Sequence, residues 1–190
     1  MNFLNSFEIP ILDFIQDNLK CGFLDKVMPI ITSLADKGIF WILIAVVMLF
    51  FRKTRKMGIT MGVALVLGLA LGNGVLKNLF NRTRPFDVVE GIEPLIEWPH
   101  DPSFPSGHTL ASFEAAGAMM FYNKKFGISA LVVASLIAFS RMYLYVHYPT
   151  DILGGIVFGL LFAFLGYLIV NYVYKKFGFD SESEIGKIKE

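Results

Sequence analysis

Three long stretches of this 190-residue chain contain no charged side chain and are dominated by apolar residues. They cover residues 57–76, 126–140 and 152–174. An apolar helix of about 18 or more residues is long enough to cross a bilayer, because each residue adds about 1.5 Å across a hydrocarbon core about 30 Å thick. Stretches that approach or exceed this length predict an all-α fold, a polytopic transmembrane helix bundle.

Charge is scarce and nearly balanced. Only 17% of the residues are charged, against about 25% in an average soluble domain, and 17 basic against 16 acidic residues leave a net charge of +1. Disordered chains need high net charge and nucleic-acid-binding proteins need a basic surplus, so both classes are excluded. The single cysteine, Cys21, allows no internal disulfide and no cysteine-based metal site.

The apolar runs predict about five membrane spans and a separate N-terminal helix. The spans are expected at residues 38–51, 57–80, 106–122, 126–145 and 150–174. The first is short, and it reaches spanning length by extending backwards through residues 26–35 if the helix tolerates Asp36 and Lys37 near its outer end. Residues 24–35, with Pro29 in their middle, are a candidate for an additional sixth span.

Three segments of the chain are expected. Residues 1–20 carry apolar residues at helical spacing and acidic residues where a cleaved signal peptide needs a basic head. They predict an amphipathic helix, either in the membrane interface or packed against the bundle. Residues 21–176 form the transmembrane domain, and residues 177–190 form a polar cytoplasmic tail.

Lysine and arginine in the short loops predict the orientation. Basic clusters occur at residues 52–56, 124–125 and 175–176, and these share one face if five spans alternate. Short basic loops remain in the cytoplasm. The long loop at residues 81–105 is therefore expected on the extracytoplasmic side of the cytoplasmic membrane.

Six ionisable residues collect at the extracytoplasmic ends of the expected spans. Any one of them could be a snorkelling side chain, but six at one face indicate a functional site, because such groups are costly near a membrane. Cations and free backbone amides at a helix start suit an oxyanion better than a metal. The six residues are Lys77, Arg84, His108, Arg141, His147 and Asp151, and the helix start is Ser106-Gly107.

The spacing of these residues also indicates a reaction. A histidine can attack phosphorus if a carboxylate fixes its tautomer, and Asp151 follows His147 by four residues. His108 can then protonate the leaving oxygen, provided that their environments separate the two pKa values.

Three motifs resemble the type 2 phosphatidic acid phosphatase superfamily, which comprises membrane lipid phosphatases related to vanadate haloperoxidases and glucose-6-phosphatase. The first is Lys77, six residues, then Arg84-Pro85. The second is Pro-Ser-Gly-His at residues 105–108, and the third joins Ser140-Arg141 to His147 and Asp151. All three occur in order and at the same expected membrane face.

The resemblance implies a metal-independent phosphatase that needs no cofactor. By position, His147 is the nucleophile that forms a phosphohistidine, Asp151 holds its far ring nitrogen, and His108 is the general acid and then the base. The phosphate-binding groups implied are Lys77, Arg84, Ser106, Gly107 and Arg141.

The small size and outward-facing site are similar to bacterial undecaprenyl pyrophosphate phosphatases, so that lipid is the favoured substrate. Phosphatidylglycerophosphate and phosphatidic acid are the close alternatives. A vanadate-dependent haloperoxidase is a distant alternative, because the similar enzymes of that kind are largely soluble. A non-catalytic membrane scaffold or channel-like bundle is disfavoured by the intact set of lysine, arginine, histidine and aspartate residues.

Glu114 lies inside the third expected span. It could shape the site or gate the lipid. The favoured interpretation is a neutral carboxyl bonded to a neighbouring helix near Asn73 or Asn78, because six residues of helix turn it about 600° from His108.

Overall fold

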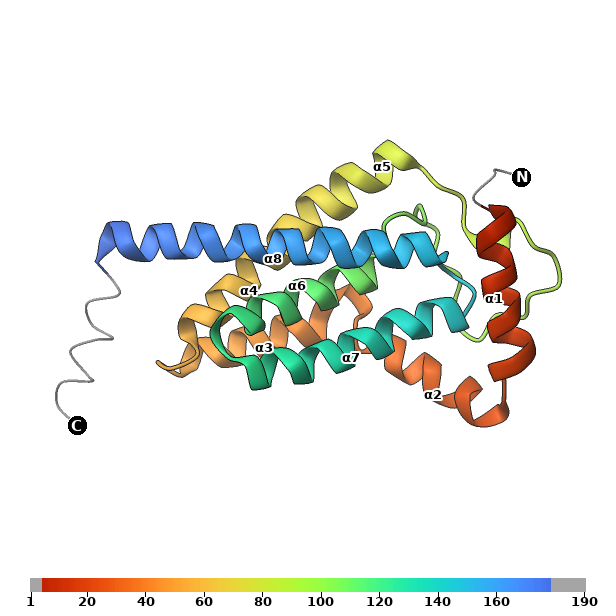
Figure 1. Cartoon of the computed structure of the whole chain (residues 1–190), viewed down its shortest axis with the longest axis horizontal. Helices are drawn as coiled ribbons and strands as arrows, with labels where there is room; N and C mark the ends of the chain where they lie inside the picture. The colour runs from red at the N-terminus through yellow and green to blue at the C-terminus, as the bar shows by residue number, and fades with distance from the viewer. Residues whose placement is uncertain (1–4, 179–190) are drawn as a thin grey trace.

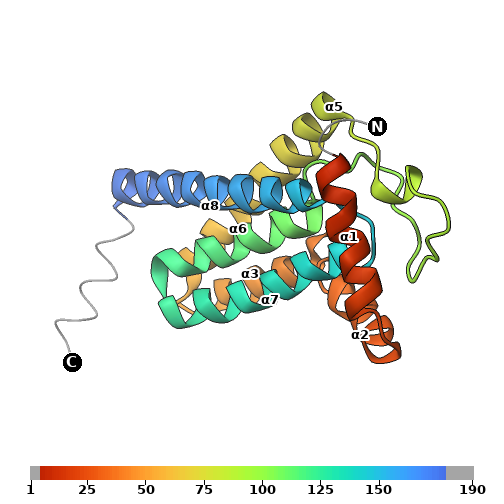
Figure 2. The same ribbon diagram turned by 45° about the vertical axis from the view of Figure 1, so that its right-hand side comes forward.

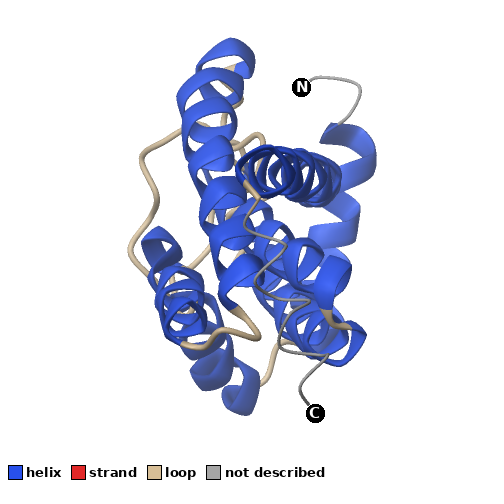
Figure 3. Ribbon diagram, turned by 90° about the vertical axis from the view of Figure 1, so that its left-hand side faces the viewer, coloured by secondary structure: helices blue, strands red, loops and turns tan. Residues whose placement is uncertain are grey.

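The computed structural model describes residues 5–178, which form helices and loops without any β-strand. Figure 3 shows this all-helical composition. Four helices run along the long axis of the molecule (Figure 1): α4 (Arg55–Leu67), α6 (Gly107–Tyr122), α7 (Lys124–Tyr143) and α8 (Pro149–Phe177). The predicted all-α membrane bundle is confirmed. Of the tail expected at residues 177–190, Phe177 is the last residue of α8 and residues 179–190 lie outside the described residues.

Three segments of the described chain are long and apolar enough to cross a membrane, namely Arg55–Asp87, Lys124–Tyr143 and Pro149–Phe177. A fourth span results if α2 (Gly22–Ser33) and the following segment Asp36–Phe50 are counted together. These two meet at an angle of 41°. The expectation of one uninterrupted helix across Asp36 and Lys37 is therefore wrong.

Backbone geometry explains this break. Lys37 and Gly38 both have positive φ angles, 52° and 69°, in the short turn η1 (Asp36–Gly38). A residue in the left-handed region cannot continue a right-handed helix. The chain therefore restarts as α3 (Ile39–Phe50), with a polar turn between the two apolar helices.

The expected third span, α6, is the centre of the bundle. With 16 residues it is about 24 Å long, shorter than the hydrocarbon core of a bilayer. It packs most extensively on α7 and α8, and it also contacts α4. Most of its side chains are buried, and many are alanine or glycine, so the neighbouring helices approach closely. Five spans were expected, and up to four segments of the described chain are long enough to cross a membrane. The remaining expected span is α6, which is too short to count by length.

The second expected span is continuous but changes its winding. After α4, residues Gly68–Leu76 form the π-helix η2, which leads into α5 (Lys77–Phe80). A π-helical turn holds more residues than an α-turn, so it rotates every later side chain about the axis. Lys77 directly follows this segment and is buried toward the interior.

The N-terminal helix α1 (Asn5–Leu19) crosses one end of the bundle, beside the long loop that follows α5 (Figures 1 and 2). Ile9, Leu12 and Ile15 are buried, whereas Phe7, Ile11 and Phe14 are exposed. The buried side contacts α7 and α8. The helix is thus packed against the bundle with a second apolar face turned outward, as an amphipathic helix at a membrane interface requires.

Because α8 packs closely on α6, a methyl group added at Gly159 of α8 should lower the stability of the bundle. A Cβ at Gly159 would lie 2.8 Å from the carbonyl oxygen of Leu110 and 3.0 Å from the Cβ of Phe113. We expect Gly159→Ala to destabilise the bundle by about 1–3 kcal/mol, because backbone cannot move aside easily. Thermal unfolding in detergent measures this.

Gly62→Ala on α4 is the matched control, because nothing lies within 4 Å of its added Cβ. We expect this variant to unfold at the parental temperature or above it, since alanine favours helix more than glycine. Equal unfolding temperatures of the two variants would contradict the packing assigned to α6 and α8.

Candidate active site

A cavity of about 400 Å³ opens at the end of the bundle where α1 and the long loop lie. It brings together residues that are far apart in sequence, since Ala35 and His147 both line it. Six of the eight residues predicted from sequence line this cavity: Lys77, Arg84, Gly107, His108, Arg141 and His147. The other two, Ser106 and Asp151, are fully buried next to them.

His147 lies in the short connection between α7 and α8. The chain turns sharply there, because Tyr145 has a φ of 58° and the Val146 N–H donates to the carbonyl of Arg141 at 3.1 Å. The His147 Nδ1 is 3.4 Å from the Asp151 Oδ2 and 3.4 Å from the Ser103 Oγ. Its Nε2 is on the other side of the ring, 3.2 Å from Arg84 Nη1. The ring therefore presents Nε2 toward the phosphate-binding groups.

The environment of His147 keeps the ring neutral. Burial lowers its pKa well below the ordinary value, and the positive charges of Arg84, Arg141 and Lys77 lower the pKa further. A neutral imidazole has a lone pair on one nitrogen and a proton on the other. With Asp151 facing Nδ1, the arrangement favours the proton at Nδ1 and the lone pair at Nε2.

Lys77 and Arg84 share one internal anion, Asp101 of the long loop. Lys77 Nζ donates to its Oδ2, and Arg84 Nη2 donates to its Oδ1 at 2.8 Å. Burial alone would raise the pKa of Asp101, but the hydrogen bond and charge of Lys77, together with Arg84, lower the pKa to about 2. Because the pKa is depressed, this ion pair is intact above the ordinary value of 3.8 and is lost only as the pH falls toward 2.

The other cavity residues also have partners within the protein. His108 Nε2 lies 2.8 Å from the Asp36 Oδ1 at the break between α2 and α3. Arg141 Nη1 donates to the Thr32 hydroxyl at 2.6 Å, whereas its Nε has no partner among residues 5–178. The side chains of Asp36 and Asp101 are 60% and 54% exposed, so both carboxylates can turn into water when another anion arrives.

Ser106 and Gly107 start α6 at the cavity. The Ser106 hydroxyl accepts hydrogen bonds from Thr109, from its N–H at 3.5 Å and from its hydroxyl at 3.0 Å, so this side chain caps the helix. Gly107 lines the cavity, and a Cβ there would lie 3.2 Å from the Asn73 side chain. The N-terminus of α6 is therefore directed at the cavity, with a glycine where the backbone is most accessible.

Glu114 differs from its expected placement. It lines the same cavity as His108, and the expected hydrogen bond to a neighbouring helix near Asn73 or Asn78 is wrong. Its Oε1 has no hydrogen-bond partner in the described part of the chain, and Asn78 instead donates to the carbonyl of Gly74. The carboxyl packs against Gly68 in the π-helix, where a Cβ would lie 1.8 Å from Oε1. The missing side chain at Gly68 makes room for this acid.

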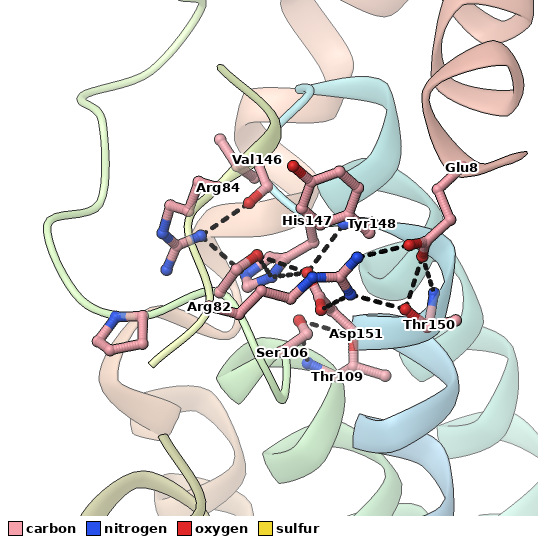
Figure 4. A network of polar contacts seen from close by, with 12 residues as sticks. Glu8, Arg82, Arg84, Ser106, Thr109, Val146, His147, Tyr148, Thr150 and Asp151 are labelled. Atoms are coloured by element: carbon pink, nitrogen blue, oxygen red, sulfur yellow. Dashed lines mark hydrogen bonds and ion pairs between the residues drawn. The ribbon is translucent and has the colours of Figure 1, made fainter. Parts of the chain in front are cut away.

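Several residues that the motifs do not contain complete the site. Figure 4 shows Arg82 between Asp151 and Glu8, at 2.7 and 2.5 Å. Ser103, two residues before the second motif begins at Pro105, donates to the Asp151 Oδ2 at 2.5 Å. None of the three residues belongs to a motif, and Ser103 carries no charge that would single it out. Their one sequence signal is position, since Arg82 and Ser103 flank motif residues.

No group of three or more His, Cys, Asp or Glu side chains in residues 5–178 is arranged to hold a metal ion. The lone cysteine, Cys21, is free and exposed at the turn between α1 and α2.

Residues 57–175 match the family model described as the PAP2 superfamily. An undecaprenyl-diphosphatase of Sulfolobus acidocaldarius is 35% identical over 126 residues, which are 66% of this chain and 61% of that protein. Undecaprenyl-diphosphatase BcrC of Bacillus subtilis is 33% identical over 142 residues, 75% of this chain and 72% of that one.

A solved structure is also similar. It is the crystal structure of a transmembrane PAP2-type phosphatidylglycerolphosphate phosphatase from Bacillus subtilis, with a TM-score of 0.71 and 30% sequence identity. The similarity covers 93% of this chain and 88% of that chain.

The shared carboxylate predicts how the cavity responds to loss of Asp101. We expect Asp101→Asn to bind inorganic phosphate about 2- to 5-fold more tightly, because the phosphate no longer competes with a carboxylate for Lys77 and Arg84. Calorimetric titration of the detergent-solubilised protein with phosphate measures the change. Asp87→Asn is the control, since this loop carboxylate accepts only from the backbone N–H of Arg84. Equal affinities in both variants would contradict this role of Asp101.

Proposed function

Since the chain belongs to the PAP2 superfamily, as its three motifs predicted, we propose that it removes the terminal phosphate of a lipid pyrophosphate, with undecaprenyl pyrophosphate as the favoured substrate. A phosphatase was predicted, and all three similar proteins are named as phosphatases. The observation that carries the proposal is one cavity lined by His108, His147 and three buried cations. The names of two relatives at 35% and 33% identity support the choice of lipid.

The first half-reaction begins with an exchange of partners. The terminal phosphate replaces Asp101 at Lys77 and Arg84, which frees the His147 Nε2 from its contact with Arg84. Nε2 then attacks phosphorus, and the bond to the leaving oxygen breaks as His108 donates a proton to that oxygen. The negative charge that develops on the phosphoryl oxygens is stabilised by the cations and by the N-terminus of α6.

The second half-reaction returns the enzyme to its starting state. His108 is now unprotonated and takes a proton from water, whose oxygen attacks the phosphorus of the phosphohistidine. The P–N bond breaks and inorganic phosphate leaves. Asp151 stabilises the proton on Nδ1 throughout, so Nε2 alone forms the covalent bond. Side chains and the N-terminal backbone of α6 supply all protein groups in this reaction, and no metal or cofactor has a step in it.

We place the site on the extracytoplasmic side of the cytoplasmic membrane. The cavity is at the end of the bundle that holds α1, whereas the basic loop Arg52–Lys56 and the Lys124–Lys125 turn are at the opposite ends of α3, α4 and α7. Short basic loops stay in the cytoplasm. The cavity therefore opens on the outer face.

Phosphatidylglycerophosphate is the second candidate substrate. It is supported by the 30% identical structure of a phosphatidylglycerolphosphate phosphatase. The phosphate-binding end of the cavity suits both lipids, because both present a terminal phosphate. Discrimination between the two lipids therefore depends on the rest of the cavity, whose wall includes Leu65, Leu69 and Glu114.

Phosphate release from a panel of lipids tests the function. We expect the detergent-solubilised protein to release phosphate fastest from undecaprenyl pyrophosphate, then from phosphatidylglycerophosphate, phosphatidic acid or diacylglycerol pyrophosphate. EDTA should leave the rate unchanged. His147→Ala should lower kcat by about 10³-fold or more, because it removes the nucleophile.

His100→Ala is the matched control, since this third histidine is exposed in the long loop and does not line the cavity. Equal rates of the two variants would refute the assignment of the nucleophile. Halide oxidation dependent on added vanadate, without phosphate release, would favour a haloperoxidase instead.

The native cysteine tests the orientation. Cys21 is exposed at the same end of the molecule as the cavity, where its N–H lies 3.4 Å from the Tyr143 hydroxyl. We expect a membrane-impermeant maleimide to label it in intact cells. A Cys21→Ser/Lys53→Cys variant places the only thiol in the basic loop instead, and it should react only after permeabilisation. The reverse pattern would place the cavity in the cytoplasm.

A further inference from the structure

One guanidinium joins the N-terminal helix to the residue that faces the nucleophile. Arg82 Nη1 donates to the Asp151 Oδ1 at 2.7 Å, and its Nη2 donates to the Glu8 Oε2 at 2.5 Å (Figure 4). Both carboxylates are buried. The guanidinium carbon also lies 3.9 Å from the centre of the Tyr148 ring, which holds the planar group from a second direction.

The contacts of Asp151 show what Arg82 controls. Its Oδ2 accepts from the Ser103 hydroxyl at 2.5 Å and from the Tyr148 N–H at 2.9 Å, and the same oxygen faces His147 Nδ1 at 3.4 Å. Arg82 is the charged group bound to the other oxygen, Oδ1. Because a carboxylate is planar, a bond at Oδ1 sets the direction of Oδ2. Arg82 therefore determines how the acid faces His147.

Glu8 fixes the position of Arg82 in turn. Its Oε1 accepts from the Thr150 N–H at 2.9 Å and from the Thr150 hydroxyl at 2.6 Å. That hydroxyl also accepts from Arg82 Nη1 at 2.7 Å. Glu8 is thereby bound both to the first turn of α8 and to the guanidinium. This closed arrangement ties α1, the residue-82 loop and the start of α8 into one unit.

Arg82 and Glu8 are separate from the substrate-binding surface. Neither residue lines the cavity, whereas Arg84, His108 and Arg141 do. They cannot bind the phosphate directly, so an effect on the reaction has to pass through Asp151. Without Arg82, the buried Asp151 carboxylate would lose the cation bonded to it, which is unfavourable in a protein interior.

We propose that Arg82 is a positioning residue for the phosphatase reaction and that Glu8 supplies its second anchor, so that the N-terminal helix α1 is a working part of the active site. This inference rests on the proposed function. It assigns α1 a role in turnover that interfacial binding to a membrane would not require.

Two carboxylates of α1 allow a matched comparison. Glu8 bonds to Arg82, whereas Asp13 accepts from the Tyr145 hydroxyl at 2.6 Å and has no contact with Asp151. Each anchors the same helix to the same end of the bundle. If α1 matters only as a packed helix, Glu8→Ala and Asp13→Ala should have similar effects.

We expect Glu8→Ala to lower kcat about 10-fold and Arg82→Gln to lower it about 10- to 100-fold, as supporting residues of active sites do. KM and the inhibition constant of inorganic phosphate should stay within about twofold, because the cavity cations are intact. Asp13→Ala should keep the parental kcat. Arg82→Lys should recover part of the loss, since lysine restores the charge but not the three bonds of the fork.

A readout without turnover separates this inference from the proposed function. The chain has three histidines, so ¹⁵N NMR of histidine-labelled protein in detergent can follow His147 alone after assignment by single variants. We expect the Nδ1–H tautomer in the parent and in Asp13→Ala, and a larger Nε2–H population in Arg82→Gln and Arg82→Lys.

Each outcome decides a distinct question. Equal kcat losses in Glu8→Ala and Asp13→Ala, or an unchanged His147 tautomer in both Arg82 variants, would overturn the positioning role. A parent protein that releases no phosphate from any lipid of the panel would overturn the proposed function. The positioning role of Arg82 would then be tested by the tautomer of His147 alone.

Discussion

Buried charge at one end of an apolar bundle is the constraint on which the rest of the structure depends. Lys77, Arg84 and Arg141 are each almost fully buried there. A buried cation is costly unless hydrogen bonds and opposite charge compensate it. Asp101 meets two of the three, and the Thr32 hydroxyl meets the third. The long loop, the break between α2 and α3, and α1 all bring polar partners to this end, so their placement follows from the same requirement.

These pairings also connect stability with function. The internal partners Asp36 and Asp101 are half exposed, so a phosphate can replace them at little cost. Asp151 is fully buried and keeps its partners on the side away from the cavity. The site therefore combines exchangeable contacts toward the substrate with permanent ones behind His147. A phosphoryl-transfer site needs both, because catalysis depends on positioning and on charge stabilisation.

Much of this could be predicted from sequence. The uncharged apolar runs predicted the continuous segment from α4 to α5, and also α7 and α8, to within a few residues, since burial in lipid leaves a strong compositional signal. The motifs predicted the family and six residues that line one cavity. The helix continuing across Asp36 and Lys37 and the hydrogen bond expected for Glu114 were wrong. The first failed because hydropathy carries no signal of the left-handed backbone at Lys37. The second failed because Asn78 bonds within its own helix, and only packing decides the partners of a buried carboxyl.

Hydropathy and motifs alone were enough to identify a membrane helix bundle of the PAP2 superfamily with its motif residues at the ends of helices. The length of an apolar run and the spacing of a motif are local properties, so they can be recognised in the sequence without knowledge of the fold. The partners of these residues became known only from the folded chain. Arg82 and Ser103 bond to Asp151 from distant segments, and Glu8 of α1 bonds to Arg82 behind it. Such contacts depend on how the helices pack against each other. Packing brings together residues that are far apart in sequence, and no periodic pattern in the sequence marks such pairs.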